Sequence, residues 1–138
     1  MSDFQGLYEV RDGTDKDANF ILATFLRGIY YGDSWFSLIP KPVFMDNYKR
    51  IAQAILKNPR TIVKIACLKE DPDVILGYSI MSSDFAIVHY LYVKSAWRKK
   101  GIGKSLIPKY PIAFTHLTAL GKSLATKYPT AIFNPFAI

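Results

Sequence analysis

The sequence has one cysteine, no long apolar run and no acidic residue beyond position 84. Because Cys67 has no second cysteine to pair with, a disulfide-stabilised scaffold is excluded. The longest apolar stretch, residues 85–93, is interrupted by His89 and is far shorter than the roughly 18 residues that a membrane-spanning helix needs. The N-terminal residues lack the basic start and apolar core of a signal peptide. We therefore expect a cytoplasmic protein that does not engage a membrane.

The overall composition is typical of a compact folded domain. The chain has 138 residues, of which 50% are hydrophobic and 21% are charged. A chain of this size buries roughly 68–70% of its unfolded surface, so intrinsic disorder is not expected. No repeat, linker or low-complexity segment divides the sequence, and we expect residues 1–138 to form a single domain.

Positive charge is concentrated in the C-terminal part of the chain. The sequence has 18 Lys and Arg against 11 Asp and Glu, which gives a formal net charge of +7. All the acidic residues precede residue 85, whereas eight of the basic residues follow it. Five of these eight lie within eleven residues, namely Lys94, Arg98, Lys99, Lys100 and Lys104. This density predicts a cationic site for a phosphate group, with a solvated surface face as the alternative.

Hydrophobic periodicity predicts an α/β domain with a mixed sheet and helices on its faces. The spacing of Thr14 and Asp17 is that of a capping box before the first helix, and Pro42 suits the first turn of the second. Residues 30–36 should form a loop between these helices. The expected order is a strand at 7–11, helices at 15–29 and 42–57, strands at 61–68, 74–81 and 85–94, a short helix after 103, a strand at 112–120, one or two helical turns at 122–128 and a strand at 130–136.

Residues 91–107 place a strand, a basic glycine loop and a helix start in succession. Glycines let the backbone turn closely around an oxyanion, and the first N–H groups of a helix can donate to phosphate oxygens. A Walker A loop would need glycine where Arg98 stands, and a dinucleotide-binding fingerprint would need glycine where Leu106 stands. Both of these nucleotide-binding folds are therefore disfavoured. No metal site is expected, since His116 has no nearby Cys, Asp or Glu in the sequence.

The loop resembles the acyl-CoA signature of the GNAT superfamily of N-acetyltransferases. Residues 98–103, Arg-Lys-Lys-Gly-Ile-Gly, fit its Arg/Gln-x-x-Gly-x-Gly/Ala pattern. The resemblance extends upstream to the strand ending and to Trp97, and downstream to Leu106 and Ile107, so that it covers 17 residues in motif and nearly the whole chain in element order. It implies a GNAT-like fold with a central, mostly antiparallel sheet of about six strands, three to four flanking helices and a CoA cleft between the fourth and fifth strands.

The resemblance also implies a cofactor site for acetyl-CoA, with CoA as the product. Backbone N–H groups from Lys99 to Lys104 would hold the pyrophosphate, and Arg98, Lys100 and Lys104 would add positive charge. Backbone groups of the strand ending would pair with pantetheine and orient the acetyl carbonyl. The cofactor-binding residues predicted in this way are Leu91, Val93, Arg98, Lys99, Lys100, Gly101, Ile102, Gly103 and Lys104.

Acid and base groups are scarce in the segment that resembles the family's active site. Family members often place a carboxylate on the fourth strand as a base, and this sequence has none there after Asp84. The remaining candidates are His89, Asp84, Asp33 and a water relay. Tyr128 resembles the tyrosine that often protonates the departing CoA, although the usual Asn before that short helix and Gly-Phe after it are absent. The predicted catalytic residues are thus Tyr128, His89 and Asp84.

We expect an acetyl-CoA-dependent N-acetyltransferase whose acceptor is a primary amine on a small molecule, a peptide N-terminus or a lysine. Tyr30, Tyr31, Asp33, Trp35 and Phe36 could form an aromatic acceptor pocket with one acid, or could close the core between the first two helices. The alternative function is a catalytically weak GNAT-fold protein whose basic face binds a ligand, a protein or nucleic acid. An RNA-binding domain is not expected, because the aromatic residues lack the spacing of known single-strand platforms. The sequence is compatible with either a monomer or a homo-oligomer.

Overall fold

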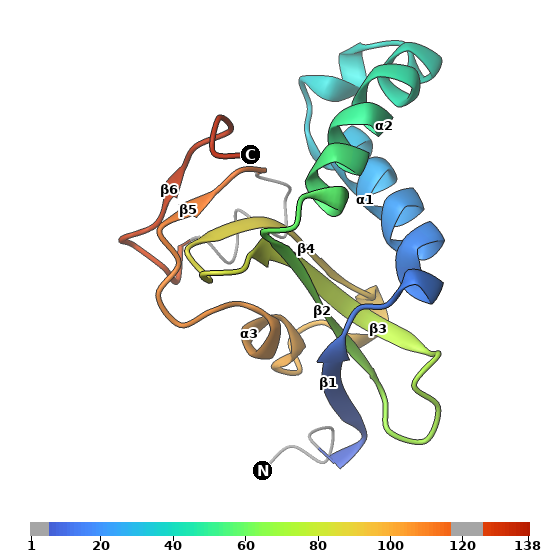
Figure 1. The fold of residues 1–138 in the computed structure, drawn as a ribbon, viewed down its shortest axis with the longest axis vertical. Coiled ribbons are helices and arrows are strands. Elements are labelled where there is room, and N and C mark those ends of the chain that lie inside the picture. Colours follow the sequence, from blue (N-terminus) through green and yellow to red (C-terminus); the bar gives the residue numbers. More distant parts are fainter. Residues whose placement is uncertain (1–5, 117–125) are drawn as a thin grey trace.

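A computed structural model describes residues 6–116 and 126–138 as a six-stranded sheet with helices on both faces (Figure 1). The elements, in chain order, are β1 (Tyr8–Asp12), η2 (Asp15–Asp17), α1 (Ala18–Gly32), η3 (Phe36–Leu38), α2 (Lys41–Lys57), β2 (Thr61–Leu68), β3 (Ile75–Ser82), β4 (Ile87–Val93), η4 (Ser95–Trp97), α3 (Ile102–Leu106), β5 (Ala113–Phe114) and β6 (Ile132–Phe133). None of the helices in these ranges is long and apolar enough to cross a membrane.

The strands lie in the sheet in the order in which they occur in the chain. Strands β1 to β4 pair antiparallel, whereas β5 joins β4, and β6 joins β5, in parallel. The expected mixed, mostly antiparallel sheet of six strands is therefore confirmed. Between β3 and β4 the register shifts, since Ile80 faces Tyr90 but Met81 faces Val88, and His89 is left at the irregularity.

The predicted helix starts are confirmed, and one predicted loop is wrong. The Asp17 carboxylate accepts the Thr14 N–H at 2.8 Å, as the capping box requires, and a 3-10 turn precedes α1. Pro42 lies in the first turn of α2. Residues 30–32 were expected in a loop but continue α1 to Gly32. Glycine lowers helix propensity by only about 1 kcal/mol, and packing of the helix face outweighs that cost.

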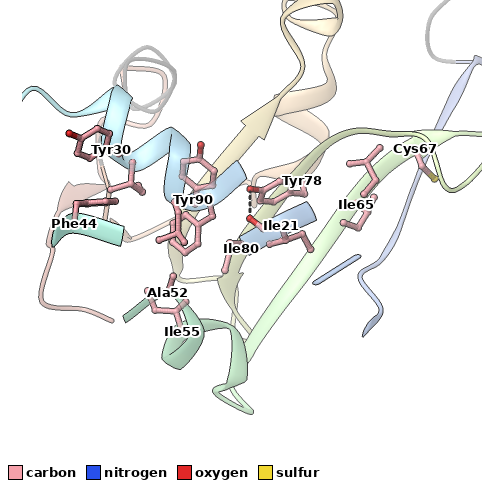
Figure 2. Close-up of a cluster of buried hydrophobic side chains, with 14 residues drawn as sticks. Ile21, Tyr30, Phe44, Ala52, Ile55, Ile65, Cys67, Tyr78, Ile80 and Tyr90 are labelled. Atoms are coloured by element: carbon pink, nitrogen blue, oxygen red, sulfur yellow. Dashed lines mark hydrogen bonds between the residues drawn. The ribbon is translucent and has the colours of Figure 1, made fainter. Parts of the chain in front are cut away.

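Two apolar cores form, one on each face of the sheet. The first lies between the sheet and the α1–α2 pair, where the ring of Tyr78 is fully buried and its hydroxyl donates to the Ile21 carbonyl at 3.2 Å (Figure 2). The second lies under α3, whose Ile102 and Leu106 pack against Leu76 and other buried residues of the sheet. Because these two α3 side chains are almost completely buried, they fix the loop that precedes the helix against the sheet.

The structure describes only part of the C-terminal strands that the sequence predicts. Of the expected strand 112–120, Ala113–Phe114 is paired among the described residues 112–116, and of the expected strand 130–136, Ile132–Phe133 is paired. Pro135 lacks the backbone N–H that a longer ladder at 130–136 would need. Residues 117–120 and most of the helical turns expected at 122–128 lie outside the described residues. The predicted short third helix is confirmed at five residues, ending before Pro108.

A close contact between α1 and β4 generates a stability prediction. A Cβ atom at Gly28 would lie 1.7 Å from the Tyr90 hydroxyl oxygen and 2.8 Å from its Cζ atom. We expect Gly28→Ala to lower the free energy of unfolding by about 1–3 kcal/mol, the usual cost of overpacking. Gly6→Ala, where nothing lies within 4 Å, is the control. In urea denaturation, adding Tyr90→Phe to Gly28→Ala should recover part of the loss, and equal stability of Gly28→Ala and the unmodified protein would contradict the contact.

The Arg11–Asp17 ion pair generates a pH prediction. The Arg11 guanidinium donates to both Asp17 oxygens at 2.8 and 2.9 Å, and this hydrogen bonding lowers the pKa of the carboxyl to about 2. Because the folded pKa is below the unfolded value of about 3.9, the pair stabilises the fold above about pH 4 and that contribution is lost as the pH falls toward 2.

Asp17→Asn should therefore destabilise the protein by roughly 1–3 kcal/mol at pH 7 and by progressively less between pH 4 and pH 2. The measurement is the urea midpoint at each pH, with the exposed Asp15→Asn, in the same turn, as the matched control. A deficit that does not shrink on acidification would show that the ion pair is not its origin.

Candidate active site

The predicted glycine loop connects β4 to α3 through a tight backbone path. Lys99 has a φ of 61° and Gly101 a φ of 85°, both in the left-handed region. Glycine adopts this region without cost, whereas a lysine there stores about 1–3 kcal/mol of strain. Gly101 is the N-cap of α3, and its carbonyl accepts the Ser105 N–H at 3.1 Å. The loop is thus held in a conformation that an unconstrained lysine would not choose.

A cavity of about 930 Å³ opens beside this loop, and positive charge dominates its lining. Among its described lining residues are five cations and no acid. Lys109 and Lys127, which the sequence analysis did not single out, join the predicted loop residues there. The lining residues are Val93, Arg98, Lys99, Gly101, Gly103, Lys104, Ile107, Lys109, Tyr110, Lys127 and Tyr128. Such a surface attracts an anionic ligand and disfavours a cationic one.

Three of the predicted cofactor residues, Leu91, Lys100 and Ile102, are not among the lining residues of this cavity. Lys100 turns its ammonium to the Ala96 carbonyl at 3.1 Å, and Ile102 is buried in the core under α3. The Leu91 side chain is buried in that core as well. Arg98 lines the cavity while its Nε donates to the Val93 carbonyl at 3.0 Å, which fixes the guanidinium beside the end of β4.

Strands β4 and β5 share a short parallel contact. Within residues 6–116 and 126–138, Ile87 and Val88 pair with β5, opposite Ala113 and Phe114. On its other side β4 bonds to β3, and just after β4 the Lys94 N–H donates to the Leu76 carbonyl. Hydrogen-bonded residues alternate along an antiparallel strand, so the main-chain N–H and C=O groups of residues 91 and 93 point away from β3. This is the side on which the resemblance places pantetheine.

A second, smaller pocket of about 250 Å³ lies between the helical pair and the C-terminal strands. Asp33, Trp35 and Phe36 line it, as the sequence suggested, and Tyr48, Thr115 and His116 close it from the other side. Tyr30 is instead buried in the core with its hydroxyl on the Ile39 carbonyl, and Tyr31 is exposed beside Lys41. The aromatic cluster expected at 30–36 therefore divides between core, surface and pocket.

Hydrogen bonds join two histidines across the gap between β4 and β5. His89 Nδ1 lies 3.1 Å from Thr115 Oγ1, which in turn lies 2.9 Å from His116 Nδ1. His116 Nδ1 also meets the His89 carbonyl at 2.9 Å, while Nε2 contacts the Tyr48 hydroxyl. Burial lowers the pKa of both histidines, that of His116 to about 4, and raises the pKa of Tyr48 to about 12. Both imidazoles are therefore neutral at pH 7.

The other two predicted catalytic residues lie in different surroundings. The Tyr128 ring lines the cationic cavity against Phe114, and burial raises the pKa of its hydroxyl. Asp84 lies exposed in the turn before β4, where its carboxylate accepts the Ser82 hydroxyl at 2.6 Å and the Ala86 N–H at 3.0 Å. These hydrogen bonds lower the pKa of Asp84, and the residue lines neither of the two cavities.

Sequence reasoning missed Tyr48, Thr115 and His116 as site residues. The available signal was the position of His116 on the predicted fifth strand, next to the cleft that the resemblance implies. The sequence alone considers His116 only as a metal ligand. Within residues 6–116 and 126–138, no group of three or more His, Cys, Asp or Glu side chains could hold a metal ion.

Comparison with solved structures identifies the fold that this arrangement of strands, helices and loop forms. No family model matches the sequence, and no curated protein matches it. Among solved structures, a Pyrococcus furiosus protein assigned as an acetyl transferase superposes with a TM-score of 0.59 at 14% identity, covering 91% of this chain and 79% of its own. The chain has the GNAT fold.

Two further GNAT-fold structures agree. The structure titled as histone acetyltransferase HPA2 and related acetyltransferase from Corynebacterium glutamicum has a TM-score of 0.52 at 14% identity, covering 91% of this chain and 75% of its own. A GCN5-related N-acetyltransferase from Rhodopseudomonas palustris has a TM-score of 0.50 at 18% identity, covering 88% and 68%. The likeness resides in the fold, because the sequence identities are low.

Proposed function

We propose that residues 1–138 form a single acetyl-CoA-dependent N-acetyltransferase domain acting on a primary amine. The observation that carries this proposal is the cavity beside the glycine loop of a GNAT fold, whose described lining has five cations and no acid and includes Val93 at the end of β4. CoA carries several phosphate groups on one flexible molecule, and a cavity of about 930 Å³ with dispersed cations suits such a ligand.

The loop residues would bind CoA in three ways. Backbone N–H groups of residues 99–104 would donate to the pyrophosphate, and the left-handed turn at Gly101 lets the chain approach it closely. Arg98, Lys104 and the other cavity cations would supply charge-assisted hydrogen bonds. Ile102 would act indirectly, because its burial under α3 anchors the loop. Lys100 would add charge while bracing the loop through the Ala96 carbonyl.

Acetyl-CoA supplies an activated acetyl thioester. The chain must then orient its carbonyl, accept protons from the amine and return one to the departing sulfur. Backbone groups of Leu91 and Val93 point away from β3 and would orient the carbonyl and pantetheine. Tyr128, in the same cavity as the loop, would protonate the sulfur, and its raised pKa keeps the proton on the hydroxyl at neutral pH. His89 is buried beside Thr115, and the proposals of His89 and of Asp84 as a base rest on the sequence alone.

The first prediction concerns CoA binding measured by calorimetry. Gly103→Val should weaken binding at least tenfold, because a branched side chain would obstruct the approach of the phosphates. Lys104→Ala should cost roughly 1–3 kcal/mol, as for a lost charge-assisted hydrogen bond, and the loss should shrink in high salt. The exposed Lys49→Ala on α2 is the charge-matched control. Unchanged affinity in a folded Gly103→Val protein, or equal affinity for CoA and unphosphorylated pantetheine, would contradict the assignment.

The second prediction concerns turnover, followed as free thiol release from acetyl-CoA with a panel of primary amines and peptides. Tyr128→Phe should lower kcat at least tenfold without changing the acetyl-CoA Kd, because the ring packing is kept and only the proton donor is lost. Tyr31→Phe, exposed on α1 and not among the lining residues of this cavity, is the control. If acetyl-CoA binds but no amine is acetylated, the catalytically weak binding protein becomes the better description. Full activity in Tyr128→Phe would remove that tyrosine from the mechanism.

A further inference from the structure

The second pocket has aromatic walls. Trp35 and Phe36 lie with ring centroids 5.4 Å apart, and Phe36 meets Tyr48 at 5.3 Å. Phe133 closes the C-terminal side. The enclosed volume of about 250 Å³ is below the roughly 300–1,000 Å³ of pockets for drug-sized ligands. A flat or compact apolar body therefore fits these walls better than a long polar one.

A single carboxylate stands among the described lining residues of this pocket. Asp33 Oδ1 accepts the backbone N–H groups of Trp35 at 2.8 Å and Phe36 at 3.2 Å, which fixes the side chain in the wall. Among the described residues, none donates to the other oxygen, Oδ2. A carboxylate with one oxygen committed to the backbone and the other without a described donor can hold one ammonium group, and neighbouring aromatic faces add cation–π attraction.

The hydrogen bonds of His116 determine which of its nitrogens can accept a proton. A carbonyl oxygen only accepts, so the 2.9 Å contact with the His89 carbonyl places the imidazole proton on Nδ1. Nε2 is then the acceptor, and it takes the hydrogen bond of the Tyr48 hydroxyl. Both side chains line the pocket. The pair therefore presents a proton-accepting path that runs from the pocket through the hydroxyl to the imidazole.

We infer that this pocket binds the acceptor, a monoamine with one primary ammonium group on a compact aromatic or apolar body, and that Tyr48 and His116 take its proton. The inference rests on the proposed N-acetyltransferase function and specifies its substrate class. Asp33 orients the ammonium, and the aromatic rings of Trp35, Phe36 and Tyr48 hold the apolar body of the amine. A polyamine fits poorly, because its second and third ammonium groups would find no further described carboxylate in the pocket.

The proton and bond changes balance for this assignment. The ammonium gives one proton to the Tyr48 hydroxyl as that hydroxyl passes its own to His116 Nε2. The freed lone pair forms the N–C bond to the acetyl carbon, and the C–S bond breaks. A second amine proton replaces the one that Tyr128 donates to the sulfur. The proton on His116 leaves to solvent, so each turnover yields one amide, one thiol and one released proton.

The test compares 2-phenylethylamine, spermidine and a lysine peptide as acceptors for the purified protein with acetyl-CoA. We expect kcat/KM for 2-phenylethylamine to exceed that for either competitor at least tenfold. Asp33→Asn should raise the KM for this amine at least tenfold and leave the acetyl-CoA Kd unchanged. Asp46→Asn, exposed on α2, is the charge-matched control. A preference for spermidine or for the peptide, or an unaltered amine KM in Asp33→Asn, would overturn the inference.

The proton path is tested with two substitutions in case one disturbs folding. His116→Gln should lower kcat at least 100-fold, the lower range for a positioned base, and Tyr48→Phe should lower kcat while leaving the amine KM within threefold. Tyr31→Phe, exposed on α1, is the control for tyrosine loss. Unchanged kcat in a folded Tyr48→Phe or His116→Gln protein would overturn the path. Acetyl-CoA binding to the unmodified protein is measured separately. If acetyl-CoA does not bind, the proposed function is refuted. If acetyl-CoA binds but the protein acetylates other amines and not 2-phenylethylamine, this inference is refuted and the proposed function stands.

Discussion

The parallel contact between β4 and β5 is the constraint on which the rest of the site depends. Among the described residues two pairs join these strands, and the main-chain groups of residues 91 and 93 point away from β3. The glycine loop and Tyr128 line the cationic cavity, which Val93 at the end of β4 also lines. Tyr48 and His116 line the smaller pocket, and His116 follows β5. Both cavities therefore depend on where β4 ends and on how β5 lies beside it.

The two cavities differ in charge. The cavity beside the loop has cations and, in its described lining, no acid, whereas the smaller pocket has one described carboxylate and neutral imidazole. Under the proposed function, an anionic cofactor and a cationic amine would each be drawn to a separate cavity and kept from the other by like charge. The absence of acids after residue 84 would then help to place the cofactor as well as to bind it.

Element order, the capping box and the glycine loop could be predicted because each depends on local sequence. Thr14 with Asp17, Pro42 and residues 98–103 carry their structural consequence within a few positions. The His116–Tyr48 contact could not, because it joins residues 68 positions apart through a register that only the folded sheet defines. The loop expected at residues 30–32 failed for the same reason. Glycine there signals a break locally, but Ile29 and Tyr30 are buried in the core with residues distant in sequence, and α1 continues to Gly32.

The parallel edge of the sheet bears on how the molecule moves. A strand of two residues contributes very few ladder hydrogen bonds, and β5 and β6 are both of this length, while β2 and β3 each have eight residues. Local opening free energy follows the number of buried contacts and ladder bonds that must break together. The C-terminal edge, which carries Thr115 and His116, is therefore expected to open locally at a lower free energy than the antiparallel half. Under the proposed function, such local opening would let ligands enter and leave without unfolding of the domain.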